Sequence, residues 1–370
     1  MTQPTNFTVV GAGHGGKAMA AYLAIMGKRV IIYNRTFTNI ELVGKRGGIE
    51  LESYEGGPHG FGEIAQVTSD MEEAIKNAEV IMVVVPSSAH ASLARAMAPH
   101  LKDGQIIVLH PGRTCGSIEF DKILHDMNVT ADITISEAET FIYASRTDGP
   151  VQARIFRIKD AVPLAALPAN RTQDVLDTLQ DVYPQYIDGI NVLHTGLNNM
   201  GAIFHPGLTI LNAGRIESTL GDFQFYIDGV TPSVARVLEA LDRERVTVAS
   251  AVGIRARTAM EWLKVAYNVS GADLNEAIHN QSGYQGIMAP STLNHRYIFE
   301  DVPMSLVPIA ALGQQYGVSV RGMDSMIRMA CIINRTDYWR RGRTLDKLGI
   351  KGLSVSELNQ YVDEGVRADH

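Results

Sequence analysis

Residues 9–16 have the sequence Val9-Val10-Gly11-Ala12-Gly13-His14-Gly15-Gly16 and connect an apolar segment to a helical one. Residues 7–10 have the continuous apolar character of a strand that is buried on both faces, and residues 17–26 predict a helix with small residues toward the sheet. A second apolar run, over residues 29–33, predicts another strand. Together the three segments predict a βαβ unit of a doubly wound sheet.

Four residues of this turn are expected to bind a dinucleotide, namely Gly11, Gly13, His14 and Gly16. In the G-x-G-x-x-G pattern the first glycine permits a tight turn, the second lets the backbone approach the phosphates, and the third allows close packing of helix on strand. The free N–H groups at the start of the helix favour an anion. The chain contains 34 glycines, so the pattern gains its weight from the strand before it and the helix after it. The alternative is a strand-turn-helix that binds no ligand.

The end of the second predicted strand indicates which dinucleotide is bound. An NAD site usually carries Asp or Glu there to bond the ribose 2′-hydroxyl, whereas a 2′-phosphate requires a cation and neutral donors. This chain has Asn34-Arg35-Thr36 and no acid, and a guanidinium holds a phosphate by paired hydrogen bonds. The triplet resembles that of NADP-dependent phosphogluconate dehydrogenases. We therefore predict NADP; the alternative is that Arg35 is a solvated turn residue and that the cofactor is NAD.

More apolar segments predict central strands of the same sheet, at residues 78–86, 105–110 and 132–138. Ligands bind where the strands of a doubly wound sheet end. We therefore expect Pro86, Ser87 and Glu139 to contact the cofactor. A compatible alternative is that Ser87 or Ser88 caps the following helix.

The remaining pattern divides the chain into two parts. Further strands are predicted at residues 48–53 and 63–67, with antiparallel strands at the margin of the sheet at residues 151–159 and 160–167. Beyond about residue 190 the pattern becomes helical, including one long helical stretch over residues 234–267. We predict an α/β protein with a Rossmann-type dinucleotide-binding domain over residues 1–190 and a mostly α-helical domain over residues 191–370.

The composition excludes several classes of protein. The chain has 370 residues, of which 45% are hydrophobic, and this suits two domains with sizeable cores. A formal net charge of −7 argues against nucleic acid or an anionic membrane surface as a partner, and the longest apolar run, over residues 80–86, is too short to span a bilayer. Met1-Thr2-Gln3-Pro4 leads directly into the first predicted strand and leaves no room for a secretory leader, so we expect a cytoplasmic protein.

The cysteines give little indication of a metal site. Cys115 and Cys331 have no C-x-x-C spacing, which disfavours both a metal site and a disulfide framework. Cys115 lies near a predicted cofactor loop, where a small residue that fills the loop is favoured over a nucleophile. We therefore predict no metal.

Two segments of the helical part carry more polar side chains than packing requires, at residues 198–207 and 294–303. On one continuous helix Asn198 and His205 are two turns apart and face the same way. A polar pair on an otherwise apolar helix indicates a cleft. The alternatives are a histidine that is satisfied within the core and an asparagine that only caps or packs.

Five motifs occur in this order along the chain. They are the glycine turn, Pro-Gly-Arg-Thr at residues 111–114, Glu-Thr-Phe at residues 139–141, Asn-x-x-x-x-x-x-His-Pro at residues 198–206 and Arg-Tyr-x-x-Glu-Asp-Val-Pro at residues 296–303. With this combination the chain resembles the octopine/nopaline (opine) dehydrogenase family over nearly its whole length. One departure is Cys115, where the family pattern favours glycine.

The resemblance implies a Rossmann domain followed by a helical domain. It also implies a reaction in which the amine of an amino acid condenses with the carbonyl of an α-keto acid, and NADH or NADPH reduces the resulting imine. The matching motifs place the catalytic histidine at His205, its partner aspartate at Asp301 and the carboxylate-binding arginine at Arg296. Family analogy further suggests a homodimer formed through the helical domain.

Elementary chemistry agrees with these roles. Histidine transfers protons near neutral pH, a carboxylate on its second ring nitrogen fixes the tautomer, and a guanidinium anchors a substrate carboxylate. Asn198 is expected to orient the carbonyl oxygen or the imine nitrogen. The alternatives are that Arg296 pairs with Glu300 at the surface, that Asp301 caps the helix after it, and that Asn198 only packs.

Two other functions are compatible with parts of the sequence. The first is a reductase of a small anionic ketone, similar to ketopantoate reductase or glycerol-3-phosphate dehydrogenase. Those families use a lysine of the helical domain as the proton donor, and residues 194–206 contain no lysine. The second is an NADP-binding sensor without turnover, which an intact set of His, Asp and Arg disfavours.

Overall fold

The computed structural model describes residues 5–54 and 56–367, so Met1-Thr2-Gln3-Pro4 lies outside the described residues. The chain forms two compact units, one of residues 1–195 and 360–370 and the other of residues 196–359. The first unit thus extends to residue 195 rather than 190, and it also includes residues 360–370, which were predicted to belong to the helical domain. The end of the chain belongs to the first unit because the Tyr361 hydroxyl and the Arg367 guanidinium both bond the Asp121 carboxylate.

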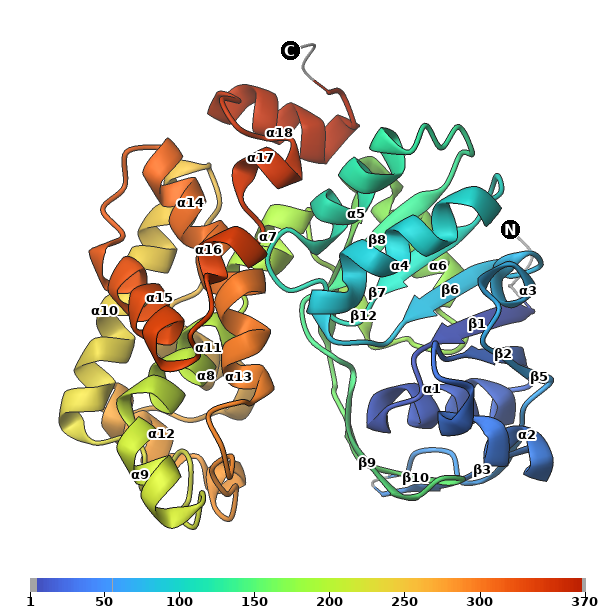
Figure 1. Cartoon of the computed structure of the whole chain (residues 1–370), viewed down its shortest axis with the longest axis horizontal. Helices are drawn as coiled ribbons and strands as arrows, with labels where there is room; N and C mark the ends of the chain where they lie inside the picture. The colour runs from blue at the N-terminus through green and yellow to red at the C-terminus, as the bar shows by residue number, and fades with distance from the viewer. Residues whose placement is uncertain (1–4, 55, 368–370) are drawn as a thin grey trace. The chain divides into compact units, whose positions relative to one another are not determined.

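An eight-stranded sheet forms the centre of the first unit, with strand order β12-β11-β8-β7-β6-β1-β2-β5 (Figure 1). Its strands are β1 (Asn6–Val10), β2 (Arg29–Tyr33), β5 (Gln66–Thr68), β6 (Val80–Val83), β7 (Ile106–Leu109), β8 (Thr134–Ala138), β11 (Val162–Leu167) and β12 (Tyr186–Asp188). The strands from β5 to β8 pair in parallel, whereas β11 is antiparallel to β8. The predicted βαβ unit, the central strands and an antiparallel strand within residues 160–167 are confirmed.

The two faces of this sheet contribute to two different cores. In β6, Val80 and Met82 belong to one core, and Ile81 and Val83 belong to the other. The first core includes side chains of α1 (His14–Ile25) and α6 (Thr172–Leu179). The second core is formed with α3 (Met71–Ile75), α4 (His90–Met97) and α5 (Gly116–Asp126). Because helices cover both faces, the strand must be apolar on both sides, as its sequence indicates.

A second, four-stranded sheet was not predicted. Its strands follow the order β4 (Gly60–Glu63), β3 (Gly48–Ser53), β10 (Gln152–Ile158) and β9 (Tyr143–Gly149). Strands of this sheet contact α1, so the helix is buried between two sheets. The expectation that residues 151–159 lie at the margin of the first sheet is therefore wrong.

Residues 63–67 do not form the single strand that was predicted. The chain passes from one sheet to the other at Ile64 and Ala65, where the Ile64 N–H donates to Gly47 O at 2.9 Å and the Ala65 N–H donates to Val30 O at 3.0 Å. β4 thus ends at Glu63, and β5 begins at Gln66. Consecutive N–H groups therefore bond acceptors in two different sheets, and this divides the predicted strand into β4 and β5.

The second unit is helical. Its elements are α8 (Gly201–Leu211), α9 (Ala213–Thr219), α10 (Pro232–Ala251), α11 (Ala259–Tyr267), α12 (Leu274–Asn280), α13 (Arg296–Phe299), the π-helix η6 (Val302–Leu306), α14 (Val307–Gln315), α15 (Arg321–Ile333), α16 (Tyr338–Arg341) and α17 (Leu345–Leu348). The long helix α10 packs on α8, α12, α14 and α15. Helices α7 (Val192–Leu197) and α18 (Val355–Glu364) each include residues of both units. Over the described residues, the structure contains no helix with the length and apolar character needed to cross a membrane.

The long helical stretch predicted at residues 234–267 is interrupted. α10 ends at Ala251, and Gly253 then adopts φ 84°, in the left-handed region that glycine tolerates. Thr258 begins α11 with a capping box, in which its side chain accepts from the Glu261 N–H and the Glu261 side chain accepts from the Thr258 N–H. The glycine and the capping box therefore divide the predicted helical stretch into two helices.

Candidate active site

The predicted cofactor residues gather at one edge of the main sheet. β1, β6, β7 and β8 run in parallel, so their carboxyl ends lie on the same side. The glycine turn follows β1, Pro86 and Ser87 lie just beyond β6, and Glu139 follows β8. This is the edge at which a doubly wound sheet binds ligands.

The glycine turn has the geometry that a phosphate requires. Gly11 has φ 118°, and a Cβ on it would lie 2.2 Å from Val84 O; a Cβ on Gly16 would lie 2.0 Å from Gly11 O. By contrast, a Cβ on Gly13 would meet nothing within 4 Å. Gly13 is the N-cap of α1, with no side-chain capping bond and no acid in the first turn. The start of α1 is thus an open cradle of backbone N–H groups that suits a pyrophosphate.

Gly15 is a further member of this turn that the sequence analysis did not single out. A Cβ on it would lie 2.7 Å from the Phe141 ring. The Glu139-Thr140-Phe141 segment therefore packs directly against the start of α1.

His14 is held in one tautomer by the second sheet. Its Nδ1 accepts from the Thr147 N–H at 3.0 Å and lies 2.7 Å from Thr147 Oγ1. A ring nitrogen that accepts carries no proton, so the neutral ring has its proton on Nε2. Burial lowers the pKa of His14, and Arg146 and Lys17 add to this effect. The residue is thus a neutral N–H donor beside the phosphate cradle.

The other predicted cofactor residues differ in exposure. Asn34 donates from Nδ2 to Thr36 O at 2.8 Å, while Arg35 and Thr36 are exposed beyond β2. Ser87 is buried, with 1% exposure. The N-cap residues of the helices at this point are Pro86 for η2 (Ser87–Ala89) and Ala89 for α4, and neither makes a side-chain capping bond.

The Pro-Gly-Arg-Thr loop is shaped by a buried carboxylate. Glu137 accepts from the Ser117 N–H at 2.9 Å and from its hydroxyl at 2.8 Å, and a Cβ on Gly112 would lie 2.3 Å from Glu137 Oε2. Cys115 has φ 61°, a conformation that favours glycine, and is 1% exposed. This conformation gives a physical reason for the glycine that the family pattern favours there.

His205 and Asp301 meet in the helical unit. His205 lies on α8, and its Nδ1 is 2.9 Å from Asp301 Oδ2. The Asp301 side chain is completely buried, whereas that of His205 is 21% exposed. Asp301 precedes η6 without making a side-chain capping bond, so the capping alternative is wrong. Segments of π-helix occur often at functional sites.

An aromatic side chain fixes the plane of this imidazole. Tyr297 stacks on His205 with ring centroids 4.1 Å apart and an interplanar angle of 21°, and it stacks on Phe225 at 5.2 Å and 19°. His295 contacts the same ring edge-on at 4.4 Å. Sequence reasoning missed the role of Tyr297, although it lies inside the quoted motif beside Arg296.

Arg296 is half-exposed and paired. Its Nη2 lies 2.9 Å from Glu300 Oε2, with 48% of the Arg296 side chain and 1% of the Glu300 side chain exposed. The alternative pairing with Glu300 is therefore present. A guanidinium has five N–H donors, so this pairing orients the group and leaves donors for a substrate carboxylate.

Asn198 does not lie on one helix with His205, contrary to the prediction. α7 ends at Leu197, and α8 begins at Gly201. Asn198 Oδ1 accepts from the Arg257 N–H at 2.9 Å, and Asn199 Nδ2 donates to Ser305 Oγ at 2.9 Å. Two consecutive asparagines thus bond other segments of the unit, and such side chains compete with helix formation.

A buried ion pair holds this junction. Arg245 is fully buried, lies 2.7 Å from Asp242, and donates to Leu197 O and Arg257 O. Asp242 also accepts from the Ala259 N–H at 2.7 Å. Sequence reasoning missed this pair, for which the available signal was opposite charges three residues apart on an otherwise apolar face of α10.

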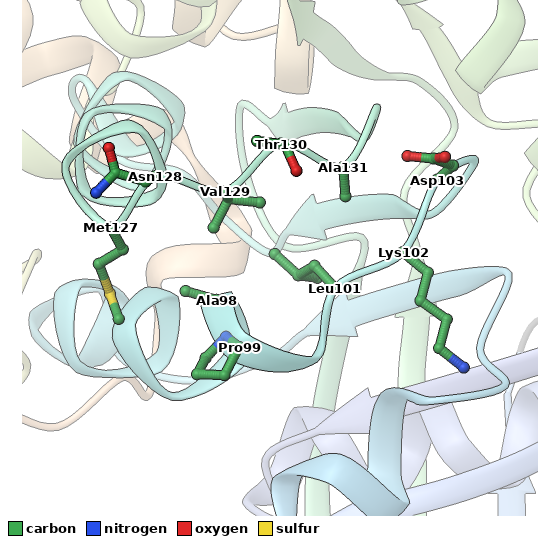
Figure 2. Close-up of a pocket in the computed structure, with 10 residues that line it drawn as sticks. All are labelled: Ala98, Pro99, Leu101, Lys102, Asp103, Met127, Asn128, Val129, Thr130 and Ala131. Carbon is green, nitrogen blue, oxygen red and sulfur yellow. The ribbon is translucent and has the colours of Figure 1, made fainter.

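A large hollow lies at the opposite edge of the main sheet, at the amino ends of β7 and β8. It has a volume of about 650 Å³ and is lined by residues 98–99, 101–103 and 127–131 (Figure 2). Lys102 Nζ donates to Lys76 O at 2.8 Å, and Asp103 Oδ1 accepts from the Asp132 N–H at 2.7 Å. Its charged groups therefore serve the fold, and the hollow is remote from the cofactor edge.

Comparison with known proteins identifies the family. A family model for the α-helical domain of NAD/NADP octopine/nopaline dehydrogenases matches residues 189–334. The opine dehydrogenase of Arthrobacter sp. (strain 1C) is 38% identical over 363 residues, which cover 98% of this chain and 100% of that protein. The chain belongs to the octopine/nopaline (opine) dehydrogenase family. The resemblance stated from the motifs is confirmed.

Solved structures of opine dehydrogenases share the fold. Octopine dehydrogenase in complex with NADH and agmatine is 21% identical with a TM-score of 0.83, covering 98% of this chain and 99% of that one. Yersinopine dehydrogenase with NADP⁺ bound is 14% identical with a TM-score of 0.74, over 98% and 99% of the two chains. The predicted two-part fold class is confirmed.

The alternative reductase is not favoured. A family model for the N-terminus of NAD-dependent glycerol-3-phosphate dehydrogenase matches residues 6–112, which belong to the dinucleotide-binding unit. The likeness to opine dehydrogenase extends over both units. This opine dehydrogenase family member is an NAD(P)-dependent oxidoreductase of the opine dehydrogenase type.

Proposed function

We propose that the protein condenses an amino acid with an α-keto acid and reduces the imine, with His205 as the acid/base residue. A bound nicotinamide dinucleotide supplies the hydride. The observation that carries the proposal is the 2.9 Å contact between His205 Nδ1 and the buried Asp301 carboxylate. Loss of the carbonyl oxygen as water requires a proton, and the reverse reaction requires a base.

The proton that is exchanged with the substrate is carried by Nε2 of His205, the ring nitrogen that does not face Asp301. Asp301 accepts from the Nδ1–H of His205, so the exchangeable proton sits on Nε2. A buried carboxylate beside the ring also stabilises the imidazolium that forms when the reaction runs in reverse. Tyr297 stacks on the imidazole of His205 and restrains its plane, so the Nε2–H bond keeps one direction.

Arg296 is proposed to anchor a substrate carboxylate. Its pairing with the buried Glu300 holds the guanidinium in place without using all of its donors. Asn198 is proposed to orient the reacting oxygen or nitrogen with its amide N–H₂ group, because its Oδ1 already accepts from Arg257.

For the cofactor we propose NADP. The pyrophosphate would lie on the cradle of Gly11, Gly13, His14 and Gly16, with Pro86, Ser87 and Glu139 beyond the neighbouring strands. Asn34, Arg35 and Thr36 would hold the 2′-phosphate, and the exposure of Arg35 together with the absence of acid in the triplet supports this. We expect Arg35→Ala to weaken NADPH binding about tenfold or more and NADH binding little. An equal loss for both dinucleotides would assign NAD.

The function is tested by following NADPH oxidation with a keto acid alone, an amino acid alone, and both together. Oxidation that requires both supports the proposal, and oxidation with the keto acid alone would support a simple reductase. His205→Ala should lower turnover about 100-fold or more, on the scale of general acid/base catalysis, with little change in NADPH binding. His125→Ala serves as the control, because that side chain is 62% exposed on α5. Unchanged turnover of His205→Ala would remove the residue from this role.

Two properties accompany the proposal. We propose a homodimer formed through the helical unit, by analogy with the family, and a cytoplasmic location. Light scattering coupled to gel filtration tests the first, and cell fractionation tests the second.

A further inference from the structure

Lys159 lies at the carboxyl edge of the main sheet and has no part in the chemistry above. It directly follows β10, and its backbone N–H donates to Ile142 O at 3.0 Å. Its Nζ donates to Thr140 Oγ1 at 2.7 Å. Thr140 belongs to the segment after β8 that packs on the start of α1 through Phe141. The ammonium is therefore brought to the cofactor edge by a strand of the second sheet.

Charged groups of both signs surround this ammonium. Burial lowers the pKa of Lys159 to about 8; Arg113 and Arg157 also lower it, and only Glu139 raises it. Arg157 is paired with Asp160 at 3.0 Å. Within residues 5–54 and 56–367, the acceptor that the Lys159 ammonium reaches is the neutral hydroxyl of Thr140. An ammonium has three donors, so two remain for a ligand.

We propose that Lys159, together with Arg113, forms an oxyanion-binding site at the carboxyl ends of β7 and β8, and that its ligand is a carboxylate of a substrate. Arg113 belongs to the loop between β7 and α5, so the two cations come from neighbouring loops. A charge-assisted bond to a carboxylate would use the donors that Thr140 leaves on the Lys159 ammonium, where water is partly excluded. The site deepens the proposed function, on which its ligand class rests.

The strand order favours a carboxylate over a phosphate. The sheet runs β8-β7-β6-β1-β2, and the phosphate cradle and the Asn34-Arg35-Thr36 triplet follow β1 and β2. β7 and β8 lie on the other side of β6. A dinucleotide whose phosphates lie at β1 and β2 would not place them at Lys159, whereas an α-keto acid or an amino acid carries a carboxylate of its own.

The first test needs no turnover, so its failure is separate from failure of the proposed function. Lysines are acetylated with a limiting amount of acetic anhydride and quantified by mass spectrometry, without ligand, with NADPH, with pyruvate or 2-oxoglutarate, and with NADP⁺ plus either keto acid. Acetylation of Lys159 should fall about fivefold or more when a keto acid is present. Lys45, which is 67% exposed and paired with Glu41, is the internal control and should not change.

Two other outcomes of the acetylation experiment would overturn the proposal. Protection by NADPH alone, with no effect of either keto acid, would overturn the carboxylate assignment and make the ligand a phosphate. Equal acetylation of Lys159 in all samples would overturn the site itself.

The second test compares Lys159→Met with Lys159→Arg. The methionine variant should raise the KM for one of the two substrates about tenfold or more, change kcat and the NADPH Kd by less than about twofold, and be rescued by arginine. In the wild type, the KM for the same substrate should rise as the pH passes about 8, because the Lys159 ammonium loses its proton there. In Lys159→Arg this KM should not change over the same pH range. Lys45→Met is the matched control. A KM that is unchanged in Lys159→Met would contradict the proposal.

Discussion

Asp301 is completely buried, while the imidazole of His205, held 2.9 Å away, keeps 21% of its side chain exposed. The carboxylate therefore cannot meet a substrate, and the ring can. The difference in exposure supports the proposal that the acid orients the ring and that the imidazole contacts the reacting atoms.

Replacement of the acid tests this division. We expect Asp301→Asn to lower kcat about 100-fold or more, because an amide no longer selects the tautomer with the proton on Nδ1, in which Nε2 is free to exchange a proton with the substrate. The measurement is steady-state turnover with both substrates, and the thermal midpoint shows whether the variant is folded. Asp324→Asn is the control, since that carboxylate contacts Gln314 at the surface. A loss of less than about threefold would exclude the orienting role.

Tyr297 should matter through its ring rather than its hydroxyl. Tyr297→Phe keeps the stack on His205 and should retain nearly full activity, whereas Tyr297→Leu should lose about threefold to tenfold in kcat, as expected for one aromatic pair. The thermal midpoints distinguish this role from a merely structural one, because a lower kcat in a variant that unfolds near the wild-type temperature reflects the orientation of the imidazole. Equal kcat in Tyr297→Phe and Tyr297→Leu would contradict the prediction.

The glycines of the turn should separate binding from folding. Gly13→Ala places a methyl group in open space, so the variant should fold normally but bind the dinucleotide at least about tenfold more weakly, because the phosphates approach at that point. Gly16→Ala places a Cβ 2.0 Å from Gly11 O and should destabilise the first unit. Fluorescence titration with NADPH and thermal unfolding measure the two effects. Normal affinity of Gly13→Ala would show that the pyrophosphate lies elsewhere.

His110 should make the first unit sensitive to acid. Burial lowers the pKa of His110 to about 3, with its Nδ1 3.1 Å from the Tyr186 hydroxyl. Between pH 6.5 and 3 the unfolded chain binds a proton that the folded chain does not, so the stability present above pH 6.5 is lost as the pH falls. The loss is on the order of 4 kcal/mol at the lower limit. Urea unfolding should show a smaller loss of stability between pH 6.5 and 4 in His110→Gln, and equal slopes would contradict the assignment.

The sequence predicted those parts of the fold that depend on local pattern. The apolar runs around β1, β2, β6, β7 and β8 were visible because a strand covered by helices on both faces must be apolar throughout. The second sheet was not visible, because β3 pairs with β10 across a distance in sequence that no local pattern reports. The division at Ile64 and Ala65 was missed for the same reason.

The candidate site was predictable where a motif names the side chain. His205 and Asp301 come from two such motifs and meet in the structure, although their roles remain predictions. The shared helix of Asn198 and His205 was wrong, because helical spacing says nothing about a tertiary bond such as that of Asn198 to Arg257. Tyr297 and Arg245 were missed because stacking and burial are properties of the folded unit.

Helix α1 is enclosed on both sides, and this limits how far the protein can be shortened. Lys17 Nζ donates to Pro150 O at 2.8 Å, and His14 bonds Thr147, so the glycine-rich helix depends on a hairpin that the ribosome completes much later. A fragment that stops at Ala138 would contain every strand of the first βαβ unit, yet it would expose one flank of that helix to water. Minimal nucleotide-binding modules cut from this chain should therefore aggregate unless they retain the hairpin of β9 and β10.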